Sequence, residues 1–344
     1  MKSNPFTTTF GIEPIAPIKR VKEADTIISE FNAEPIANYV YLITGPRGSG
    51  KTVLQSSVSN ELAKRDDWIV IDPSPKDMIL ENIASEIYET TMAKKLFLKG
   101  EFSFSFQGIS FSLKGKEPTT TANSLIKKMV GYLNKKGKRV LITIDEIDNS
   151  EQIKLFVQAY QSLIRQNYKI TLLMTGLYEN IYKLQNDKSL TFLYRAPKIH
   201  LQPLSINAIA SSYENFLHVS SEKAMEFAKF TNGYAYAYQV LGHLLYEKEE
   251  KELTKELILD FDQYMAEYVY EKIFSESSSQ EQKILLSFNT DETVKVEELR
   301  EKTSLDSKTM SVCRDRLIGV LLSPKYGYLK FAFPRFNEYL REKE

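Results

Sequence analysis

The stretch GPRGSGKT, residues 45–52, combines glycines with a lysine and a threonine at a spacing that suits phosphate binding. It fits the pattern G-x-x-x-x-G-K-[ST], in which glycines let the backbone curl so that successive N–H groups face phosphate oxygens. In that chemistry Lys51 neutralises the β- and γ-phosphates of a nucleotide, and the Thr52 hydroxyl is a ligand of Mg²⁺. The residues predicted to bind the nucleotide are Gly45, Pro46, Arg47, Gly48, Ser49, Gly50, Lys51 and Thr52.

The residues on both sides of this stretch favour a nucleotide site over a chance glycine turn. YVYLIT, residues 39–44, is β-branched and aromatic, as is typical of a buried strand, and residues 52–65 have the apolar spacing of a helix. Phosphate binding needs this context, because the N–H groups at a helix N-terminus attract anions. We therefore predict a phosphate-binding loop between a strand and a helix.

A second chemical motif is VLITIDEID, residues 140–148, an apolar run that ends in acids. A buried parallel strand delivers ligand groups at its C-terminal end. We expect Asp145 to bind Mg²⁺ together with Thr52, and Glu146 to be the base that orients and polarises an attacking water. The alternative interpretation is an acid that caps a following helix. The phosphate-binding motif upstream favours the first interpretation.

Strand and helix patterns alternate through roughly the first 200 residues. This alternation predicts an α/β fold with a mostly parallel sheet covered on both faces. The predicted strands are residues 39–44, 68–73, 138–148, 169–176 and 197–203. A strictly alternating segment, residues 101–115, predicts an inserted β-hairpin. Its phenylalanine face either packs on the protein or is a docking surface for a partner.

After residue 205 the strand patterns stop and helical patterns follow. Within residues 276–344, three helical patterns precede two short strand-like runs around Pro324–Gly327, which is the order of a winged helix-turn-helix. We therefore predict three domains: a P-loop ATPase domain at 1–204, a helical lid at 205–275 and a winged helix at 276–344.

The two motifs, the intervening strand, the lid and the winged helix together resemble the AAA+ ATPases across nearly the whole chain. The nearest branch is the bacterial and archaeal ATPases related to origin-recognition initiators, which merge with the STAND signalling NTPases. The resemblance implies ATP and Mg²⁺ as ligands and ATP hydrolysis as the activity. It implies that Thr175, at the end of the strand after Asp145, senses the γ-phosphate.

The same resemblance gives Arg195 a role between subunits. Arg195 lies just before the fifth predicted strand, where such ATPases have an arginine that reaches into the nucleotide of a neighbour. The implied state is a nucleotide-dependent homo-oligomer. The alternative is a surface arginine that pairs with an acid, because arginine is usually exposed.

The lid sequence departs from both branches of the family. Initiator-type ATPases have a lid arginine where NGYAYAYQ has Tyr236, and the signalling branch has a Gly-x-Pro turn where this chain has Ala235 in place of proline. Slow hydrolysis is therefore expected. The alternative function is a STAND-type signalling switch that acts by recruiting proteins. Residues 10–20 resemble the segment that packs against adenine, which makes Ile18 and Arg20 candidates for that contact.

Charge and composition limit the partners. The chain has 45 Lys and Arg against 45 Asp and Glu, so no overall field draws it to DNA or to an anionic membrane. In the predicted winged helix, acids offset the basic residues, so DNA binding should be modest, and DNA or a partner protein both stay open. These basic residues are Lys308, Arg314, Arg316, Lys325 and Lys330.

The cellular compartment is predicted from the number of cysteines and from the absence of long apolar runs. The single cysteine, Cys313, excludes a disulfide within the chain and favours a reducing compartment. No apolar run has the length of a membrane span, and the first residues lack the apolar core of a signal peptide. We expect a cytoplasmic protein with no membrane partner.

Overall fold

The structure is a computed structural model that describes residues 3–9, 14–15, 17–75, 78–98 and 121–343. The hairpin predicted at residues 101–115 lies outside the described residues. Contacts divide the chain into two compact units. The sheet unit contains residues 19–44 and 51–200, and the lid unit contains residues 1–18, 45–50 and 201–344. The domain boundaries at residues 204 and 275 stay predictions.

The sheet unit contains the predicted parallel sheet. Its strand order is β2-β3-β4-β1-β5, and every pairing in it is parallel. β1, β3 and β4 are buried along their whole length, which explains their continuous apolar sequences. The strands are β1 (Val40–Thr44), β2 (Trp68–Ile71), β3 (Arg139–Ile144), β4 (Ile170–Gly176) and β5 (Lys198–His200).

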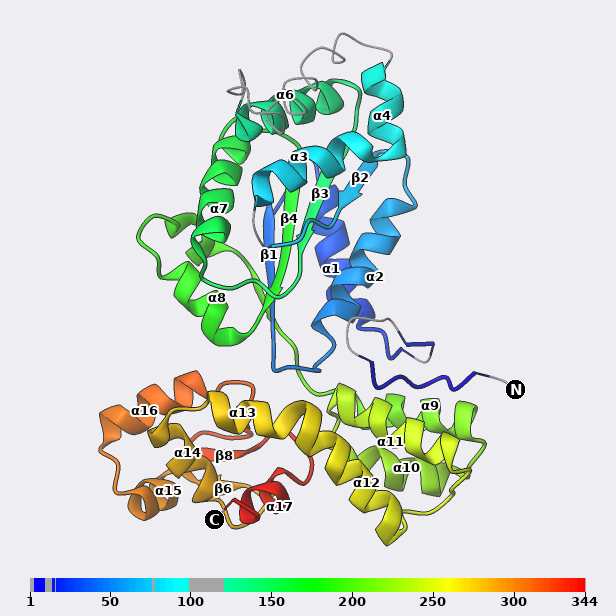
Figure 1. The fold of residues 1–344 in the computed structure, drawn as a ribbon, viewed down its shortest axis with the longest axis vertical. Coiled ribbons are helices and arrows are strands. Elements are labelled where there is room, and N and C mark those ends of the chain that lie inside the picture. Colours follow the sequence, from blue (N-terminus) through cyan, green and yellow to red (C-terminus); the bar gives the residue numbers. More distant parts are fainter. Residues whose placement is uncertain (1–2, 10–13, 16, 76–77, 99–120, 344) are drawn as a thin grey trace. The chain divides into compact units, whose positions relative to one another are not determined.

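Helices cover both faces of this sheet, as the sequence predicts (Figure 1). On one face, Phe31 of α1 packs edge-on against Tyr41 of β1, and Gln55 of α2 donates a hydrogen bond to the Leu173 carbonyl of β4. On the other face, Val40 and Leu42 belong to a buried cluster with α3, α6 and α7. The helices are α1 (Val21–Asn32), α2 (Lys51–Ala63), α3 (Ile79–Glu89), α4 (Thr91–Leu98), α6 (Ala122–Lys135), α7 (Glu151–Ile164), α8 (Tyr178–Gln185) and the 3-10 helix η1 (Thr191–Arg195).

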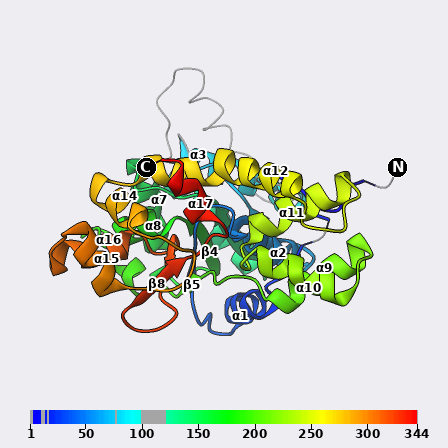
Figure 2. The ribbon, with the colours of Figure 1, turned by 90° about the horizontal axis from the view of Figure 1, so that it is seen from below.

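In the lid unit, the first helix after the sheet begins at Ile206, close to residue 205, where the predicted lid begins. α9 (Ile206–Leu217), α10 (Ser221–Phe230), α11 (Ala235–Glu247) and α12 (Lys255–Met265) gather together in Figure 2. A sharp break separates α10 from α11, where Asn232 and Gly233 both adopt positive φ, at 50° and 75°. A side chain at Gly233 would lie 2.7 Å from the Leu204 carbonyl oxygen, so only glycine fits there.

α12 does not end where a regular helix would. It continues through a π-helical turn, η2 (Ala266–Tyr270), into α13 (Glu271–Glu276). The extra residue of a π turn shifts the buried face, so that Val269 and Tyr270 are buried while Tyr268 is exposed. The spacing of Leu257, Phe261, Tyr264 and Tyr268 is that of a regular amphipathic helix, so it gives no sign of the π turn.

The last segment has three helices followed by an antiparallel hairpin, in the order predicted for a winged helix. β6 and β7 pair with β8 on opposite sides, and Asp306 caps α16 by accepting from the Lys308 and Thr309 amides. The sequence did not predict β6 or α17, and the winged-helix assignment stays a prediction. The elements are α14 (Ser279–Leu286), β6 (Val294–Lys295), α15 (Val296–Thr303), α16 (Ser307–Arg316), β7 (Leu321–Leu322), β8 (Tyr328–Phe331) and α17 (Phe336–Arg341).

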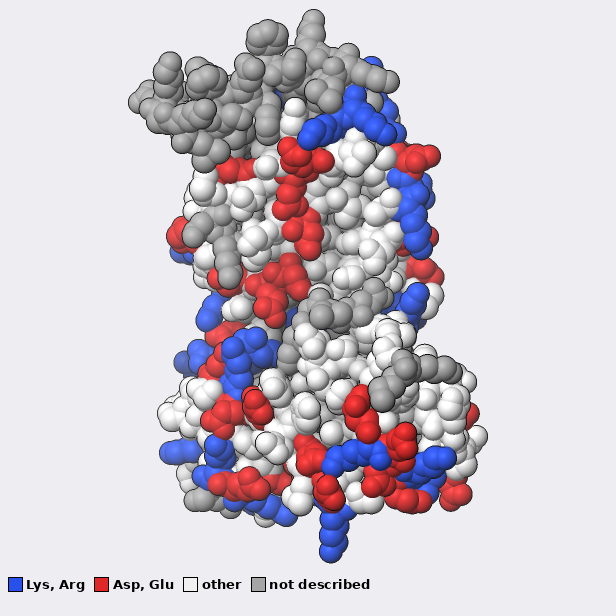
Figure 3. Space-filling view, turned by 45° about the vertical axis from the view of Figure 1, so that its right-hand side comes forward, with Lys and Arg blue, Asp and Glu red and all other residues white. Residues whose placement is uncertain are grey.

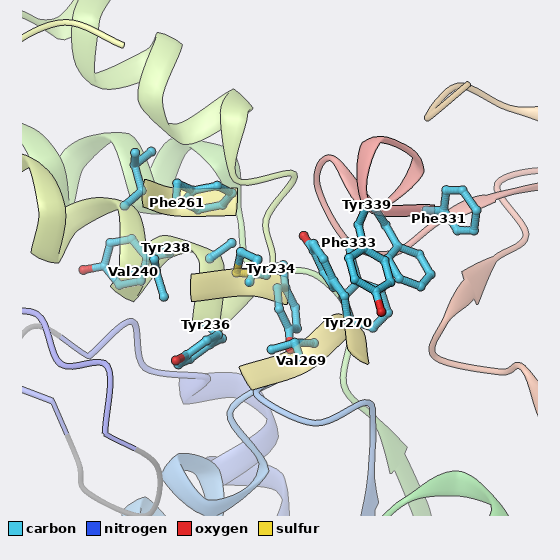
Figure 4. Close-up of a cluster of buried hydrophobic side chains, with 14 of the residues drawn as sticks. Tyr234, Tyr236, Tyr238, Val240, Phe261, Val269, Tyr270, Phe331, Phe333 and Tyr339 are labelled. Atoms are coloured by element: carbon cyan, nitrogen blue, oxygen red, sulfur yellow. The ribbon is translucent and has the colours of Figure 1, made fainter. Parts of the chain in front are cut away.

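One buried cluster joins the lid helices to this last segment (Figure 4). The Tyr234 ring lies 4.8 Å from the Phe333 ring, edge to face, and the Tyr270 ring lies 4.9 Å from that of Phe336. The Tyr270 hydroxyl donates to the Pro334 carbonyl, so this buried polar group is satisfied. Within the described residues, no helix is apolar over a stretch long enough to cross a bilayer.

A carboxyl pair lies beside this cluster. Asp291 accepts from the Asn337 amide at 3.1 Å, and its carboxyl group is hydrogen bonded to Glu338. Burial, followed by this hydrogen bond, raises the pKa of Asp291 to about 7, although the Arg335 guanidinium acts in the opposite direction.

This pair predicts a pH-dependent stability. The folded state binds a proton at Asp291 that the unfolded chain releases near pH ~4, so stability should fall as pH rises from about 4 to about 7. Asp291→Asn should remove this decline and be more stable than the wild type by about 1–2 kcal/mol at pH ~8, a value discounted for partial exposure. Urea unfolding of both proteins at several pH values measures the difference. Parallel pH dependences would contradict the prediction.

Candidate nucleotide site

Asp145 lies at the carboxyl end of β3 and is the centre of a hydrogen-bond network in the sheet unit. The Thr52 hydroxyl, in the first turn of α2, donates to Asp145 Oδ2 at 2.6 Å. The Thr175 hydroxyl, near the end of β4, donates to Asp145 Oδ1. The parallel register places Ile144 opposite Met174, so Asp145 and Thr175 follow at neighbouring strand ends. The structure therefore brings together three residues that the sequence predicted separately.

Glu146 follows directly, with its side chain exposed and its backbone held in an uncommon conformation. Its φ is 53°, in the left-handed region that a non-glycine residue rarely adopts. The Glu146 amide donates to Asp145 Oδ1 at 3.0 Å and to Thr175 Oγ1 at 3.1 Å, and these bonds hold the turn. Such held conformations concentrate at functional sites.

The alternative interpretation of Asp145 as a helix cap does not match the structure. The next helix, α7, begins at Glu151 and is capped by Ser150, whose hydroxyl accepts from the Ile153 amide. Thr175 is fully buried, and its hydroxyl is used by Asp145 and Glu146. In this structure Thr175 therefore positions the two acids. Its expected role as a γ-phosphate sensor stays a prediction.

Sequence reasoning missed a second acid at the same edge of the sheet. Asp72 directly follows β2, and Thr143 of β3 donates to its Oδ1 at 2.8 Å. Burial raises the pKa of Asp72, the hydrogen bond from Thr143 lowers it, and the negative charge of Asp145 raises it further. The signal was available, because WIVID ends in an acid in the same way as VLITID.

A histidine also lies at a strand end without having been predicted there. His200 ends β5, and its Nδ1 lies 2.6 Å from the hydroxyl of Thr44, the last residue of β1. Burial and the neighbouring charge of Lys198 lower the pKa of His200, which favours the neutral ring. The pair joins β1 to β5 immediately before the phosphate-binding motif begins.

Two glycines of residues 45–50 adopt left-handed backbone conformations. Gly48 and Gly50 have φ values of 67° and 90°, which favour glycine, and the Ser49 amide donates to the Pro46 carbonyl at 3.3 Å. These six residues belong to the lid unit, and Lys51 begins α2 of the sheet unit. Lys51 is 8% exposed, an unusual degree of burial for a lysine.

The start of α11 contacts this loop. The Tyr234 hydroxyl donates to the Arg47 carbonyl, and the Tyr236 amide donates to the Gly48 carbonyl at 3.0 Å. The Arg47 guanidinium also lies 3.4 Å from the Glu276 carboxylate of α13. Tyr236 is the residue that the sequence placed at the position of a lid arginine. Here its backbone, rather than its side chain, contacts the loop.

The remaining candidates differ in their exposure to solvent. Arg195 ends η1, is exposed and forms no ion pair with any residue that the structure describes, so the paired-arginine alternative does not hold within that part. Ile18 packs against the buried cluster of the lid unit. In the sheet unit, Arg20 lies 4.0 Å from Glu23, and burial lowers its pKa.

Two family models match different parts of the chain. Residues 37–192 match the family described as AAA domain, and this range includes both motifs and Thr175. Residues 267–340 match a second family, described as Domain of unknown function (DUF8462). None of the curated proteins compared with the chain matches it.

Solved structures share the fold over almost the whole chain. The Walker-type ATPase paby2304 of Pyrococcus abyssi has a TM-score of 0.67 at 14% identity, covering 94% of this chain and 96% of that one. The Aeropyrum pernix ORC2 protein in its ADPNP-ADP complexes has a TM-score of 0.58 at 15% identity, covering 97% and 96%. The chain has the fold of the P-loop AAA+ proteins and resembles the AAA+ ATPases, with an origin-recognition protein among its structural relatives.

The Asp145 network makes a prediction that does not depend on the nucleotide. Thr175→Val keeps the shape of the side chain but removes the hydroxyl, leaving Asp145 Oδ1 and the Glu146 amide each without one partner. Thermal unfolding followed by circular dichroism should show a loss of about 1–3 kcal/mol. Thr171→Val is the matched control, because Thr171 is equally buried on β4 and its hydroxyl has only a long 3.4 Å bond to the Val140 carbonyl. Equal losses in the two variants would contradict the assignment.

Proposed function

We propose that this protein is an ATPase that binds ATP with Mg²⁺ at residues 45–52 and hydrolyses it to drive a conformational change or an assembly step. The supporting observation is the network in which Thr52, Thr175 and the Glu146 amide all bond to Asp145. It unites a phosphate-binding helix, the acidic end of β3 and the polar end of β4. A glycine turn with only a structural role would not need these three strictly placed polar groups.

The residues present fit ATP and Mg²⁺. Hydroxyl and carboxylate oxygens are the hard ligands that Mg²⁺ prefers, and Thr52 Oγ1 and Asp145 Oδ2 lie close enough to serve one ion together. When bound, Mg²⁺ would neutralise charge on the β- and γ-phosphates. The backbone N–H groups of Gly45, Gly48 and Gly50 and the Lys51 ammonium would bind the phosphate oxygens. Pro46, Arg47 and Ser49 supply the remaining backbone of that loop.

Glu146 is the proposed general base. Its amide bonds fix the backbone, so the carboxylate leaves the strand end in a defined direction, and its exposure leaves it accessible to a water molecule. From there it would orient the water and accept its proton as the γ-phosphate is attacked. Thr175 would hold Asp145 and Glu146 in register and contact the γ-phosphate.

Arg195 supports an assembly that depends on nucleotide. An exposed arginine without an ion pair in the described residues is free to bind a phosphate outside its own subunit. We therefore propose that Arg195 completes the site of a neighbouring copy in a homo-oligomer, where its guanidinium would stabilise charge on the transferred phosphoryl group.

A STAND-type switch with slow turnover is the second candidate function. It is favoured by the lid, in which Tyr236 replaces the arginine expected of initiators and contacts Gly48 through its backbone. A lid without that arginine would hold ATP without speeding its hydrolysis. In this case the protein would act by recruiting a partner protein, and loss of hydrolysis would leave its cellular function intact.

The segment 276–344 is the proposed contact to DNA or to a partner protein. Over the molecule as a whole, basic and acidic side chains are interspersed on the face seen in Figure 3. Within the segment, Arg316 lies 3.8 Å from Glu281, so part of its basic charge is already offset. Phosphate neutralisation dominates DNA affinity, so such a mixed surface would bind DNA weakly and with strong salt dependence. Binding that resists added salt would favour a protein partner.

Two variants test binding and hydrolysis separately. Lys51→Ala should weaken Mg²⁺-ATP binding by at least about tenfold, because it removes a charge-assisted contact to the phosphates. Glu146→Gln should bind ATP like the wild type but hydrolyse it about 10²-fold more slowly. Calorimetric titration and phosphate release measure the two quantities. A wild type that binds no ATP in the presence of Mg²⁺ would refute the proposed function.

Mixing two inactive variants tests the role of Arg195. Arg195→Ala and Glu146→Gln should each hydrolyse ATP slowly alone. In a mixture, interfaces form that pair an intact Glu146 with an intact Arg195 from the neighbour, so phosphate release should rise several-fold above the sum of the two. If the mixture oligomerises with ATP but shows only that sum, Arg195 does not act between subunits.

A further inference from the structure

The outer side of the phosphate-binding loop is hydrogen bonded by the start of α11. Two successive loop carbonyls, those of Arg47 and Gly48, accept bonds from the Tyr234 hydroxyl and from the Tyr236 amide. All of these residues belong to the lid unit. The contact is close, because a Cβ at Gly48 would lie 2.6 Å from the Tyr234 hydroxyl oxygen and 2.8 Å from the Tyr236 Cβ.

Peptide geometry gives these bonds a consequence for phosphate binding. In a planar trans peptide the C=O and the following N–H point in opposite directions. Holding the Arg47 carbonyl toward Tyr234 therefore turns the Gly48 N–H away from the lid. Holding the Gly48 carbonyl toward Tyr236 does the same for the Ser49 N–H. A phosphate-binding loop must direct such N–H groups inward. In this structure the Ser49 N–H points into the loop, where it donates to the Pro46 carbonyl at 3.3 Å.

The N-terminus of α11 is built differently from those of the other lid helices. α9, α10 and α12 are capped by the hydroxyls of Ser205, Ser220 and Thr254. α11 has no side-chain cap, because Tyr234 stands at its N-cap position. Its first-turn amide at Tyr236 is satisfied by the Gly48 carbonyl instead. The loop therefore serves as the cap of this helix.

Tyr234 is itself held from the opposite side. Its ring is buried and packs edge-on against Phe333, three residues before α17 begins. Burial raises the pKa of Tyr234 far above its ordinary value, so the hydroxyl stays a neutral donor. Figure 4 shows Tyr234 and Tyr270 between the lid side chains and those of the C-terminal segment.

Two further contacts connect the loop to the C-terminal segment. The Arg47 guanidinium reaches Glu276, and a Cβ at Gly319, between α16 and β7, would lie 3.2 Å from Pro46 Cδ. Three consecutive loop residues, 46–48, thus each contact residues between 234 and 319. A change in the loop would therefore displace groups at the start of α11, in α13 and between α16 and β7.

We propose that residues 234–236 are a positioning element for the phosphate-binding loop, in which the Tyr234 hydroxyl and the Tyr236 amide set the direction of the Gly48 and Ser49 N–H groups and transmit nucleotide occupancy to the C-terminal segment. Tyr234 acts through the loop and does not contact the nucleotide. The inference rests on the proposed ATP site and assigns it a means of regulation.

The first test is ATP affinity. Tyr234→Phe removes only the hydroxyl, and calorimetry should show Mg²⁺-ATP binding weakened about threefold to tenfold, the effect of losing one hydrogen bond. Tyr238→Phe is the matched control, because this buried tyrosine lies in the same helix but its hydroxyl pairs with Ser212 at 2.5 Å. Tyr238→Phe should bind ATP like the wild type. Equal affinities of Tyr234→Phe and the wild type, or equal losses in both variants, would overturn the proposal.

The second test distinguishes positioning from a merely structural role. At saturating ATP, hydrogen exchange of the wild-type amides at 234–238 and 317–322 should slow relative to the nucleotide-free protein. In Tyr234→Phe this slowing should be lost at both segments even when every site is filled. Wild-type protein that binds ATP without any change at 234–238 overturns the proposal, whether or not the variant folds. Wild-type protein that fails to bind ATP instead refutes the proposed function.

Discussion

The Asp145 carboxylate is the point on which the site depends. It accepts from Thr52 in α2, from Thr175 in β4 and from the Glu146 amide, so one side chain fixes a helix start, a strand end and a turn. Such a half-buried charge is stable only when its oxygens are hydrogen bonded. The parallel sheet meets that condition, because neighbouring strands end at one edge. The apolar strands therefore serve the site by bringing polar residues together at their ends.

The sequence predicted the parts of this arrangement that local patterns encode. β1, β3 and β4 are buried on both faces, so their sequences are continuously apolar and easily recognised. Asp145 and Glu146 were predictable because acids that follow such a strand lie at its ligand-binding end. The left-handed backbone of Glu146 was not predictable, because it results from hydrogen bonds to a residue about thirty positions away.

The missed features share a dependence on distant partners. The π turn at Ala266–Tyr270 places Val269 and Tyr270 in a core completed by Phe333 and Phe336, which the sequence of the helix alone does not contain. Asp72 was overlooked because an isolated acid after a strand carries little signal until its neighbour Thr143 is known. β6 has only two residues and is defined by its pairing with β8. In each case tertiary contacts, rather than periodicity, decide the structure.

The lid has Tyr236 at the position where initiator-type ATPases have an arginine. Even without that arginine, the lid contacts the loop that is proposed to bind the nucleotide. An arginine would act through its charge on the phosphates, at long reach and in a salt-dependent way. The backbone contact of Tyr236 and the hydroxyl of Tyr234 instead act on the loop itself, at hydrogen-bond distance and within a buried cluster. Because α11 lacks a side-chain cap, the helix and the loop stabilise each other. In the proposed role, such a lid would respond to the conformation of the loop, and it would control binding and assembly rather than accelerate the chemical step.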